Sequence, residues 1–318
     1  MSEEYKIATD KGILDDKIFD TDILGQYDYI YDEAFPFLSS KGRLDLRNIK
    51  FINPYGALGI LILCEAILDS FGEKADLLLP GSSDESEVTS WMGSLGFLNM
   101  LQGVANVIGV SPPLYNFNGP SYIPVSKIDN LEDVENVVVE LFSKVRPILI
   151  NKLNYKEEES YRAATLIAEL CQNICQHSAL EGEKPHGYIV MQAYKSSLKL
   201  AVMDLGRGIP KTVKSKRKLY EKKDDGDIIC FACKKGILCE DHFSLGLYRT
   251  LEIIKGGEGI LNIRSGNAKM LFDYRKRNSV GEKKIPTPFF LGTQIGIYLP
   301  KKEEKRGGLE DEFEEGIF

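Results

Sequence analysis

The sequence lacks a long uninterrupted apolar run, a secretory leader and an excess of positive charge. Its longest apolar run, Ala57 to Leu68, contains Glu65 and falls short of the ~18 apolar residues of a membrane span, so it predicts a buried helix and no membrane partner. The charged start MSEEYKIATDKG has no apolar core, which argues against a secretory leader. A formal net charge of −7 excludes a surface built throughout to coat nucleic acid.

Cysteine is also sparse. The 6 cysteines are scattered in a chain without a recognisable export signal, so we expect reduced thiols and a cytoplasmic protein. The remaining composition is that of an ordinary globular protein, with 43% apolar and 27% charged residues. A length of 318 residues predicts two domains, at roughly 100–200 residues per domain.

The patterns along the chain predict where these domains lie. We expect an N-terminal extension and first domain over residues 1–105, a loop and linker helix over 106–155, and a second domain over 156–300. The charged tail, 301–318, is expected to be mobile. The linker helix contains Pro147, which should kink or break it.

A βαβα pattern runs from Gly42 to Leu101. Its parts are a strand ending near Ile52, a turn at Pro54 and Gly56, a helix from Ala57 to Ser70 ended by Gly72, a strand from Ala75 to Leu79, and a helix capped by Asp84. This order predicts parallel strands joined by crossover helices. The segment resembles a STAS domain, the fold of anti-anti-sigma factors.

That resemblance carries an expectation about regulation. In the STAS family a phosphorylatable serine often lies at the strand-to-helix turn, whereas here the turn is Asn53-Pro54-Tyr55-Gly56, without serine or threonine. Regulation by phosphorylation at this turn is therefore not expected. The domain is interpreted as a docking or dimerisation module, which includes the alternative of a homodimer.

A second pattern lies in Tyr161 to Ser178, which predicts a helix with an apolar stripe. Beside the stripe runs a polar row of Glu169, Asn173 and His177, spaced four apart and therefore on one helix face. The row has two interpretations. It is either the edge of a pocket or the solvent side of an ordinary amphipathic helix.

Three glycine-containing stretches follow: Asp204-Leu-Gly206-Arg-Gly208, Ser244-Leu-Gly246-Leu247, and Gly292-Thr293. Asp204 ends a strand in which Leu198, Leu200 and Val202 share its face, so its carboxylate should point inward and need a hydrogen-bond donor. The alternative is a β-turn in which the aspartate only caps the turn.

Together, the helix row and the three stretches resemble the N box and glycine boxes of the GHKL ATPases. That family includes sensor histidine kinases, anti-sigma-factor serine kinases, type II topoisomerases, mismatch-repair ATPases and a heat-shock chaperone. The resemblance covers residues 156–300 and is closest in style to the anti-sigma-factor kinases. It implies the GHKL (Bergerat) fold, an α/β sandwich with a mixed sheet and helices on one face.

The resemblance also implies ATP and Mg²⁺ as ligands, with a role for each motif residue. Asp204 would accept the adenine amine, Thr293 would complete that contact, and Gly206, Gly208 and Gly292 would allow close backbone approach. Asn173 would hold Mg²⁺, and Glu169 would orient or deprotonate the attacking water or protein hydroxyl. Gly246 and Leu247 would lie at the phosphates, and Ser244, which stands where many relatives have glycine, would cap the following helix. His177 is either a structural residue or a phosphate contact.

The stretch between Gly208 and Ser244 corresponds to the nucleotide lid of that family. It opens with seven Lys and Arg residues between Lys211 and Lys223, which form either a solvated face or a surface that attracts phosphate or an acidic partner. It also holds Cys230, Cys233, Cys239 and His242, whose spacing fits a zinc site. The alternative is an apolar helix over residues 227–235 without a metal.

Two functions follow from these patterns. The first is a cytoplasmic, Mg-ATP-dependent regulatory ATPase or serine/threonine kinase that acts on or through a protein partner, which could itself be STAS-like. The second is an ATP-dependent conformational switch or binding module with little or no turnover. The requirement for Glu169 distinguishes the two functions. Hydrolysis or phosphotransfer needs this carboxylate, whereas a ligand-dependent switch does not.

Overall fold

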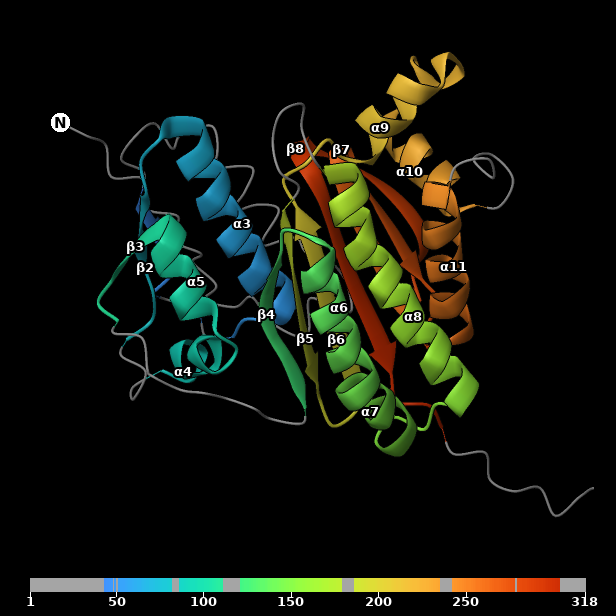
Figure 1. Cartoon of the computed structure of the whole chain (residues 1–318), viewed down its shortest axis with the longest axis horizontal. Coiled ribbons are helices and arrows are strands. Elements are labelled where there is room, and N and C mark those ends of the chain that lie inside the picture. Colours follow the sequence, from blue (N-terminus) through green and yellow to red (C-terminus); the bar gives the residue numbers. More distant parts are fainter. Residues whose placement is uncertain are drawn as a thin grey trace, which may run out of the picture.

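The computed structural model describes residues 43–47, 49, 51–81, 86–110, 121–178, 186–234, 242–277 and 279–303, of which 177, 178, 242–245 and 288 are described by backbone only. The chain is an α/β protein in two units: a small parallel sheet with helices, followed by a larger antiparallel sheet with helices (Figure 1). The predicted N-terminal extension and the tail beyond Glu303 lie outside the described residues.

The N-terminal unit is a three-stranded parallel sheet in the order β1-β2-β3. Its elements are β1 (Arg43–Asp45), α3 (Pro54–Phe71), β2 (Ala75–Leu78), α4 (Glu87–Ser94), α5 (Phe97–Val104) and β3 (Ala105–Ile108). The predicted end of α3 before Gly72 is confirmed, whereas the helix begins at Pro54, three residues before the predicted start at Ala57. The Asn53 side chain accepts from the Gly56 N–H at 2.9 Å, Pro54 stands in the first turn, and Gly72 ends the helix at φ 71°.

Helix α3 is buried along most of its length, as its apolar run predicts. It passes the length and hydropathy test for a membrane span, with a mean hydropathy of 1.4 over 18 residues, but 78% of this window is buried inside the protein. The core helix of a globular unit passes the same test, so the result is weak evidence for a membrane span. Glu65 is only 8% exposed despite its charge.

Four predictions for this unit need correction. The first strand, predicted to end near Ile52, is β1 and ends at Asp45. Ser86 caps α4 by accepting from the Thr89 N–H, while the predicted cap, Asp84, lies outside the described residues. The predicted single helix is also divided into α4 and α5 at Gly96, whose φ of 81° interrupts a helix. A third parallel strand, β3, occupies part of the predicted loop, because Ala105 to Ile108 pair with β2.

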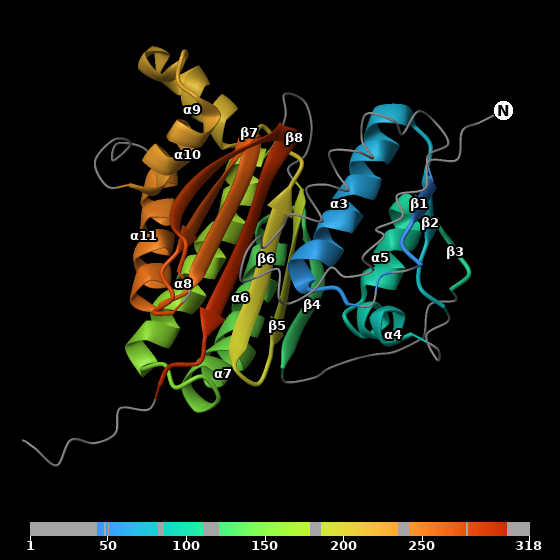
Figure 2. The same cartoon turned by 180° about the vertical axis from the view of Figure 1, so that it is seen from behind.

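The second unit is a five-stranded sheet in the order β4-β5-β6-β8-β7 (Figure 2). Its strands are β4 (Tyr122–Ile128), β5 (Gly187–Ala193), β6 (Ser197–Asp204), β7 (Ile260–Asp273) and β8 (Gly281–Pro300). Its helices are α6 (Leu131–Glu140), α7 (Arg146–Asn151), α8 (Glu157–Asn173), α9 (Ile209–Lys216), α10 (Asp225–Cys233) and α11 (His242–Gly256). The π-helical turns η1 (Leu141–Val145) and η2 (Ile174–Ser178) and the 3₁₀ turn η3 (Lys218–Tyr220) complete it.

The predicted mixed sheet is wrong, since every pairing among these five strands is antiparallel. The reason is connectivity. Direct connections join β5 to β6 and β7 to β8, and β8 separates β6 from β7, so no two parallel strands become neighbours.

The predicted linker over 106–155 also needs correction. Strand β4 pairs with β5, and α6 and α7 pack with α8, so residues 121–155 form part of the second unit. The helical path does lose its α-form near Pro147, as predicted, but the irregular turn η1 comes before the proline, over Leu141–Val145.

The two faces of the larger sheet belong to different cores. On β5, Ile189 and Met191 join the core formed with α6, α7, α8 and α11, while Tyr188 and Val190 join the core formed with α3. Helices of the second unit therefore cover one face, as expected, but α3 from the first unit covers part of the other (Figures 1 and 2). At this contact the Tyr55 hydroxyl donates to Gln294 Oε1 at 3.1 Å.

Candidate functional site

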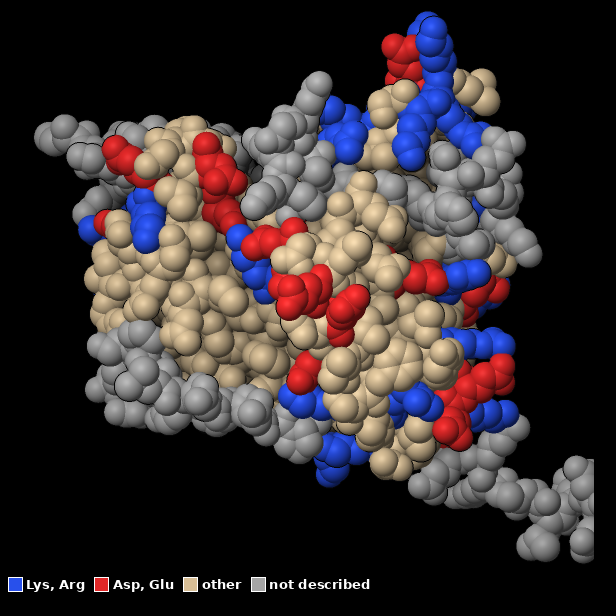
Figure 3. Space-filling model, viewed as in Figure 1, with Lys and Arg blue, Asp and Glu red and all other residues tan. Residues whose placement is uncertain are grey.

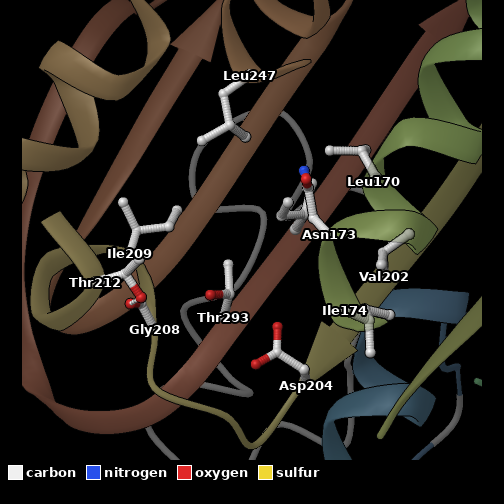
Figure 4. Close-up of a pocket in the computed structure, with 11 residues that line it drawn as sticks. Leu170, Asn173, Ile174, Val202, Asp204, Gly208, Ile209, Thr212, Leu247 and Thr293 are labelled. Atoms are coloured by element: carbon white, nitrogen blue, oxygen red, sulfur yellow. Dashed lines mark hydrogen bonds between the residues drawn. The ribbon is translucent and has the colours of Figure 1, made fainter. Parts of the chain in front are cut away.

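A pocket lies where α8, β6, β8, α9 and α11 meet. It is lined by Leu170, Asn173, Ile174, Val202, Asp204, Gly208, Ile209, Thr212, Leu247, Thr293 and Ile295. Figure 4 shows Asp204 and Thr293 beside each other at one end, with Asn173 and Leu247 toward the other. The structure thus brings together Asn173, Asp204, Gly208, Leu247 and Thr293 from segments up to 120 positions apart in the sequence. Ile209 and Thr212 were not anticipated, because no local pattern marks them.

Asp204 ends β6 opposite Thr293 of β8 and is partly buried. Its Oδ1 accepts from the Gly206 N–H at 2.8 Å, so it does cap its turn, and the carboxylate retains further acceptor capacity. Burial raises the pKa of Asp204 to about 7, against the lowering effects of the Gly206 N–H, His186 and the Thr293 N–H. An inward carboxylate with this pKa is ionised only in part at neutral pH.

Two of the predicted glycines are required by close packing of the backbone itself. A Cβ on Gly292, whose φ is 100°, would lie 2.0 Å from the Asp204 carbonyl oxygen, and a Cβ on Gly208 would lie 2.8 Å from the Gly292 oxygen. Ser265, which the sequence did not mark, holds this crossing. Its hydroxyl donates to the Gly292 carbonyl at 2.6 Å and accepts from the Ile209 N–H at 2.9 Å.

Glu169 lies one turn before Asn173 but does not line the same pocket. It lines a neighbouring groove of about 340 Å³ between α8 and α11, and its Oε1 accepts from Arg249 Nη1 at 2.9 Å. Gly246 of α11 lies between this groove and the pocket. A Cβ on this glycine would lie 3.4 Å from Glu169 Oε2 and 3.7 Å from Asn173 Nδ2, so both side chains border the same point of α11.

The predicted row of Glu169, Asn173 and His177 does not continue to its third member. Helix α8 ends at Asn173, and His177 lies in the π-helical turn η2, where the four-residue spacing no longer applies. The structure describes His177 by its backbone only. Both Asn173, the last residue of α8, and Ile174, the first residue of η2, line the pocket.

The prediction that Ser244 caps the following helix is wrong. Helix α11 begins at His242, so Ser244 lies inside its first turn. Gly246 likewise lies inside the helix and packs against α8, whereas Leu247 is buried and lines the pocket.

The pocket is narrow. Only about 30 Å³ is wide enough for water, compared with about 460 Å³ of empty space when its mouth is counted. The narrow part holds about two waters at ~15 Å³ each. A purine ring does not fit that volume, so the helices that carry Ile209 and Leu247 would have to move apart to admit one.

The segment after Gly208 folds into α9, η3 and α10. The helix predicted over 227–235 is confirmed as α10, capped by Asp224. Asp225, the first residue of α10, links this helix to its neighbours. Its carboxylate accepts from Lys214 Nζ of α9 at 2.7 Å and from the Asn267 N–H of β7 at 2.9 Å. Figure 3 shows Lys and Arg side chains gathered at the end of the molecule where α9 projects.

Two of the four zinc candidates can be located. Cys230 and Cys233 lie on α10, where burial raises the pKa of the Cys233 thiol and so disfavours the thiolate that zinc needs. Cys239 and the side chain of His242 are not among the parts of the chain that the structure describes. Within the described part of the chain, no three His, Cys, Asp or Glu side chains form a group that could hold a metal ion.

Comparison with known proteins adds no assignment: no protein-family model matches the chain, and no curated protein matches it.

Proposed function

We propose that the pocket binds the adenine of ATP, with Mg²⁺ carried on the triphosphate. The observation that supports this most strongly is the pairing of Asp204 with Thr293 at one end of a single pocket and Asn173 at the other. The carboxylate would accept the exocyclic amine of adenine. The apolar side chains of Val202, Ile209 and Ile295, which line the same cavity, offer surfaces for the ring.

The residues present fit a magnesium ion that arrives with the nucleotide. Mg²⁺ prefers oxygen ligands and commonly takes one or two from the protein and the rest from phosphates and water. The Asn173 side-chain oxygen is the candidate protein ligand. Bound Mg²⁺ would neutralise charge on the phosphates, while Gly246 leaves room beside Asn173 and Glu169.

We further propose that Glu169 acts on the nucleophile and that the protein is a regulatory ATPase or protein kinase working with a protein partner. The side chains of Glu169 and Asn173 both lie beside Gly246. Arg249 donates a hydrogen bond to Oε1 of Glu169 and so holds that oxygen in place. This would leave Oε2 to accept a proton from water or a protein hydroxyl.

A conformational switch without turnover is the second candidate. One observation favours it: α3 packs against one face of the sheet and the Asp204 pocket lies on the other face, so nucleotide binding and the N-terminal unit share this sheet. In this function ATP would alter a partner or dimer surface, and Glu169 would serve only as the partner of Arg249.

Titration calorimetry with Mg²⁺ and a non-hydrolysable ATP analogue tests the shared premise. We expect saturable binding of the ATP analogue and much weaker binding of the GTP analogue, because guanine presents a carbonyl where adenine presents the amine. No heat with either nucleotide at millimolar concentration would contradict the proposal.

Asp204→Asn should weaken adenine nucleotides selectively. Losing a hydrogen bond to a charged group costs roughly 1.5–3 kcal/mol, or about ten- to a hundredfold in affinity. Because the pKa of Asp204 is raised to about 7, wild-type affinity should fall as the pH drops through 7 and the carboxyl becomes protonated. The asparagine variant should lose that part of the pH dependence. Equal affinity in a folded variant would show that Asp204 only caps its turn.

A further inference from the structure

A groove of about 340 Å³ lies between α8 and α11. Its α8 wall carries Tyr161, Thr165 and Glu169, which are four residues apart and so follow one helix face over about 12 Å. Its α11 wall includes Arg249 and Ile253. Tyr161 is 53% exposed despite its aromatic ring. The groove therefore offers apolar surface and charged groups together, which suits a protein segment that carries both.

The last described part of the chain arrives at one end of this groove. Lys302, just after β8, donates from Nζ to Glu159 Oε1 of α8 at 2.8 Å and to the Gly256 oxygen of α11 at 3.3 Å. Each of these partners lies within three positions of a residue that lines the groove. The sequence that follows Glu303 therefore leaves the sheet where the start of α8 and the end of α11 meet (Figure 1).

The sequence after the last described residue has a pattern that fits such a groove. Leu309, Phe313 and Ile317 are four apart and would share one helix face over about 12 Å, the length of the α8 wall. Residues 309–318 also hold five acidic residues and no basic one. The preceding stretch, 303–308, can extend to about 20 Å, which is more than the single helical turn that separates the exit of the chain from the groove.

The charges on the groove walls also favour an acidic segment. Arg162 of α8 and Arg249 of α11 line the groove, and their side chains are 65% and 54% exposed. Each forms an ion pair with a glutamate, but a guanidinium group has five donors and can bind a second carboxylate. Glu252, exposed on the α11 wall, is the opposing charge. Two exposed arginines thus border the path of an acidic, apolar-striped segment.

We propose that residues 309–318 bind this groove of their own molecule as a short amphipathic helix, with the apolar stripe inward. The short connection keeps the segment at an effective concentration on the order of millimolar, so a weak contact is enough to fill the groove. Because the segment enters beside Glu159, its far end lies over Glu169 and blocks a partner protein from that carboxylate. The blocking rests on the proposed function, whereas the docking does not.

Photocrosslinking in the full chain tests the docking without nucleotide. A photoreactive benzoyl-phenylalanine in place of Phe313 should crosslink within the same chain to peptides from 161–169 or 248–253, as mapped by mass spectrometry. Crosslinked dimers alone would identify a second copy as the occupant and overturn the proposal. Crosslinks to the basic stretch 211–223 would also overturn it. So would the absence of a groove crosslink in the purified protein, which is the result expected for an external partner.

Thr165→Glu and Thr165→Lys are the matched pair of groove variants. Thr165 is half-buried in the middle of the α8 wall, so either long side chain can extend from the helix toward the groove. The glutamate should lower the crosslink yield by about threefold because it repels the acidic segment, and the lysine should maintain or raise the yield. Equal yields from the two variants, both folded by circular dichroism, would overturn docking in this groove.

Phosphate release provides the second arm. Phe313→Asp should increase turnover by about three- to tenfold, the factor expected if the segment fills the groove for about 70–90% of the time. Unchanged turnover in an active protein would refute the blocking of Glu169. A groove crosslink in a protein that turns over no ATP, with or without this substitution, would refute the proposed turnover and leave the docking supported. Turnover without a groove crosslink would refute the docking and leave the proposed function supported.

Discussion

Gly292→Ala is expected to destabilise the protein by about 3 kcal/mol or more, because a positive φ costs a non-glycine residue about 1–3 kcal/mol and a backbone clash is added to it. Gly292 has a φ of 100°, and its added Cβ would lie 2.0 Å from the Asp204 carbonyl oxygen and 2.8 Å from the Leu205 Cα. These are backbone atoms of β6 and of the turn that holds the carboxylate. They cannot rotate aside as a side chain would, so β6 and β8 must separate at this point.

Gly281→Ala is the control, since it changes the same strand. Gly281 also has a positive φ, of 68°, but its added Cβ would meet nothing within 4 Å. Urea denaturation of both variants should therefore give a loss of about 1–2 kcal/mol for Gly281→Ala, from the left-handed backbone alone, and a larger loss for Gly292→Ala. Equal losses of unfolding free energy in the two variants would show that the backbone around Asp204 can move to admit the added methyl group, and that the contact between β6 and β8 at Gly292 is not rigid.

Glu169→Ala is expected to reduce phosphate release or phosphotransfer by ~10²–10⁴-fold, the usual contribution of a positioned general base. The carboxylate lies beside Asn173 across Gly246 and is fixed by Arg249 at 2.9 Å. Because it would touch neither adenine nor metal, nucleotide affinity should change by less than about tenfold, or 1.4 kcal/mol. Arg249 is 54% exposed at its side chain, so leaving it unpaired should cost little stability, as for other surface ion pairs.

Glu252→Ala is the matched control for that measurement. Glu252 lines the same groove on α11 and is exposed, but it lies more than a turn beyond Gly246. Steady-state phosphate release and nucleotide affinity should be measured for wild type and both variants, with and without candidate partner proteins. Equal turnover in wild type and Glu169→Ala would refute the role of this carboxylate. Absence of turnover in the wild type with every partner would favour the switch.

Local signals in the sequence predicted much of the secondary structure. Pro54 and Gly72 indicated the first turn and the end of α3, because helix ends depend on backbone groups within a few residues. Alternation along Leu198 to Asp204 correctly predicted β6 and the inward position of Asp204. The polar row of the helix and the glycine-containing stretches likewise indicated Asn173, Asp204 and Thr293, which converge on one pocket, whereas Glu169 lines the neighbouring groove. Their ligand remains a prediction.

Non-local contacts explain the errors. The direction of β7 relative to β6 depends on β8 lying between them, which no periodicity encodes. The start of α11 at His242 and the π-helical turn after Asn173 depend on how α8 and α11 pack, and a regular four-residue spacing cannot express either. β4 appeared to be part of a linker because its partner, β5, lies about 60 positions later in the sequence.

The sequence alone determined the end of α3 at Gly72 and the inward position of Asp204 on β6, since these depend on neighbours within a turn or a strand. Only the tertiary structure decided which distant residues contact one another. It placed the Gly292 backbone against Asp204, Arg249 against Glu169, and Glu65 beside His186. Each of these contacts joins segments 80 or more positions apart, and the pKa of Asp204 follows from such burial and charge rather than from its own sequence context.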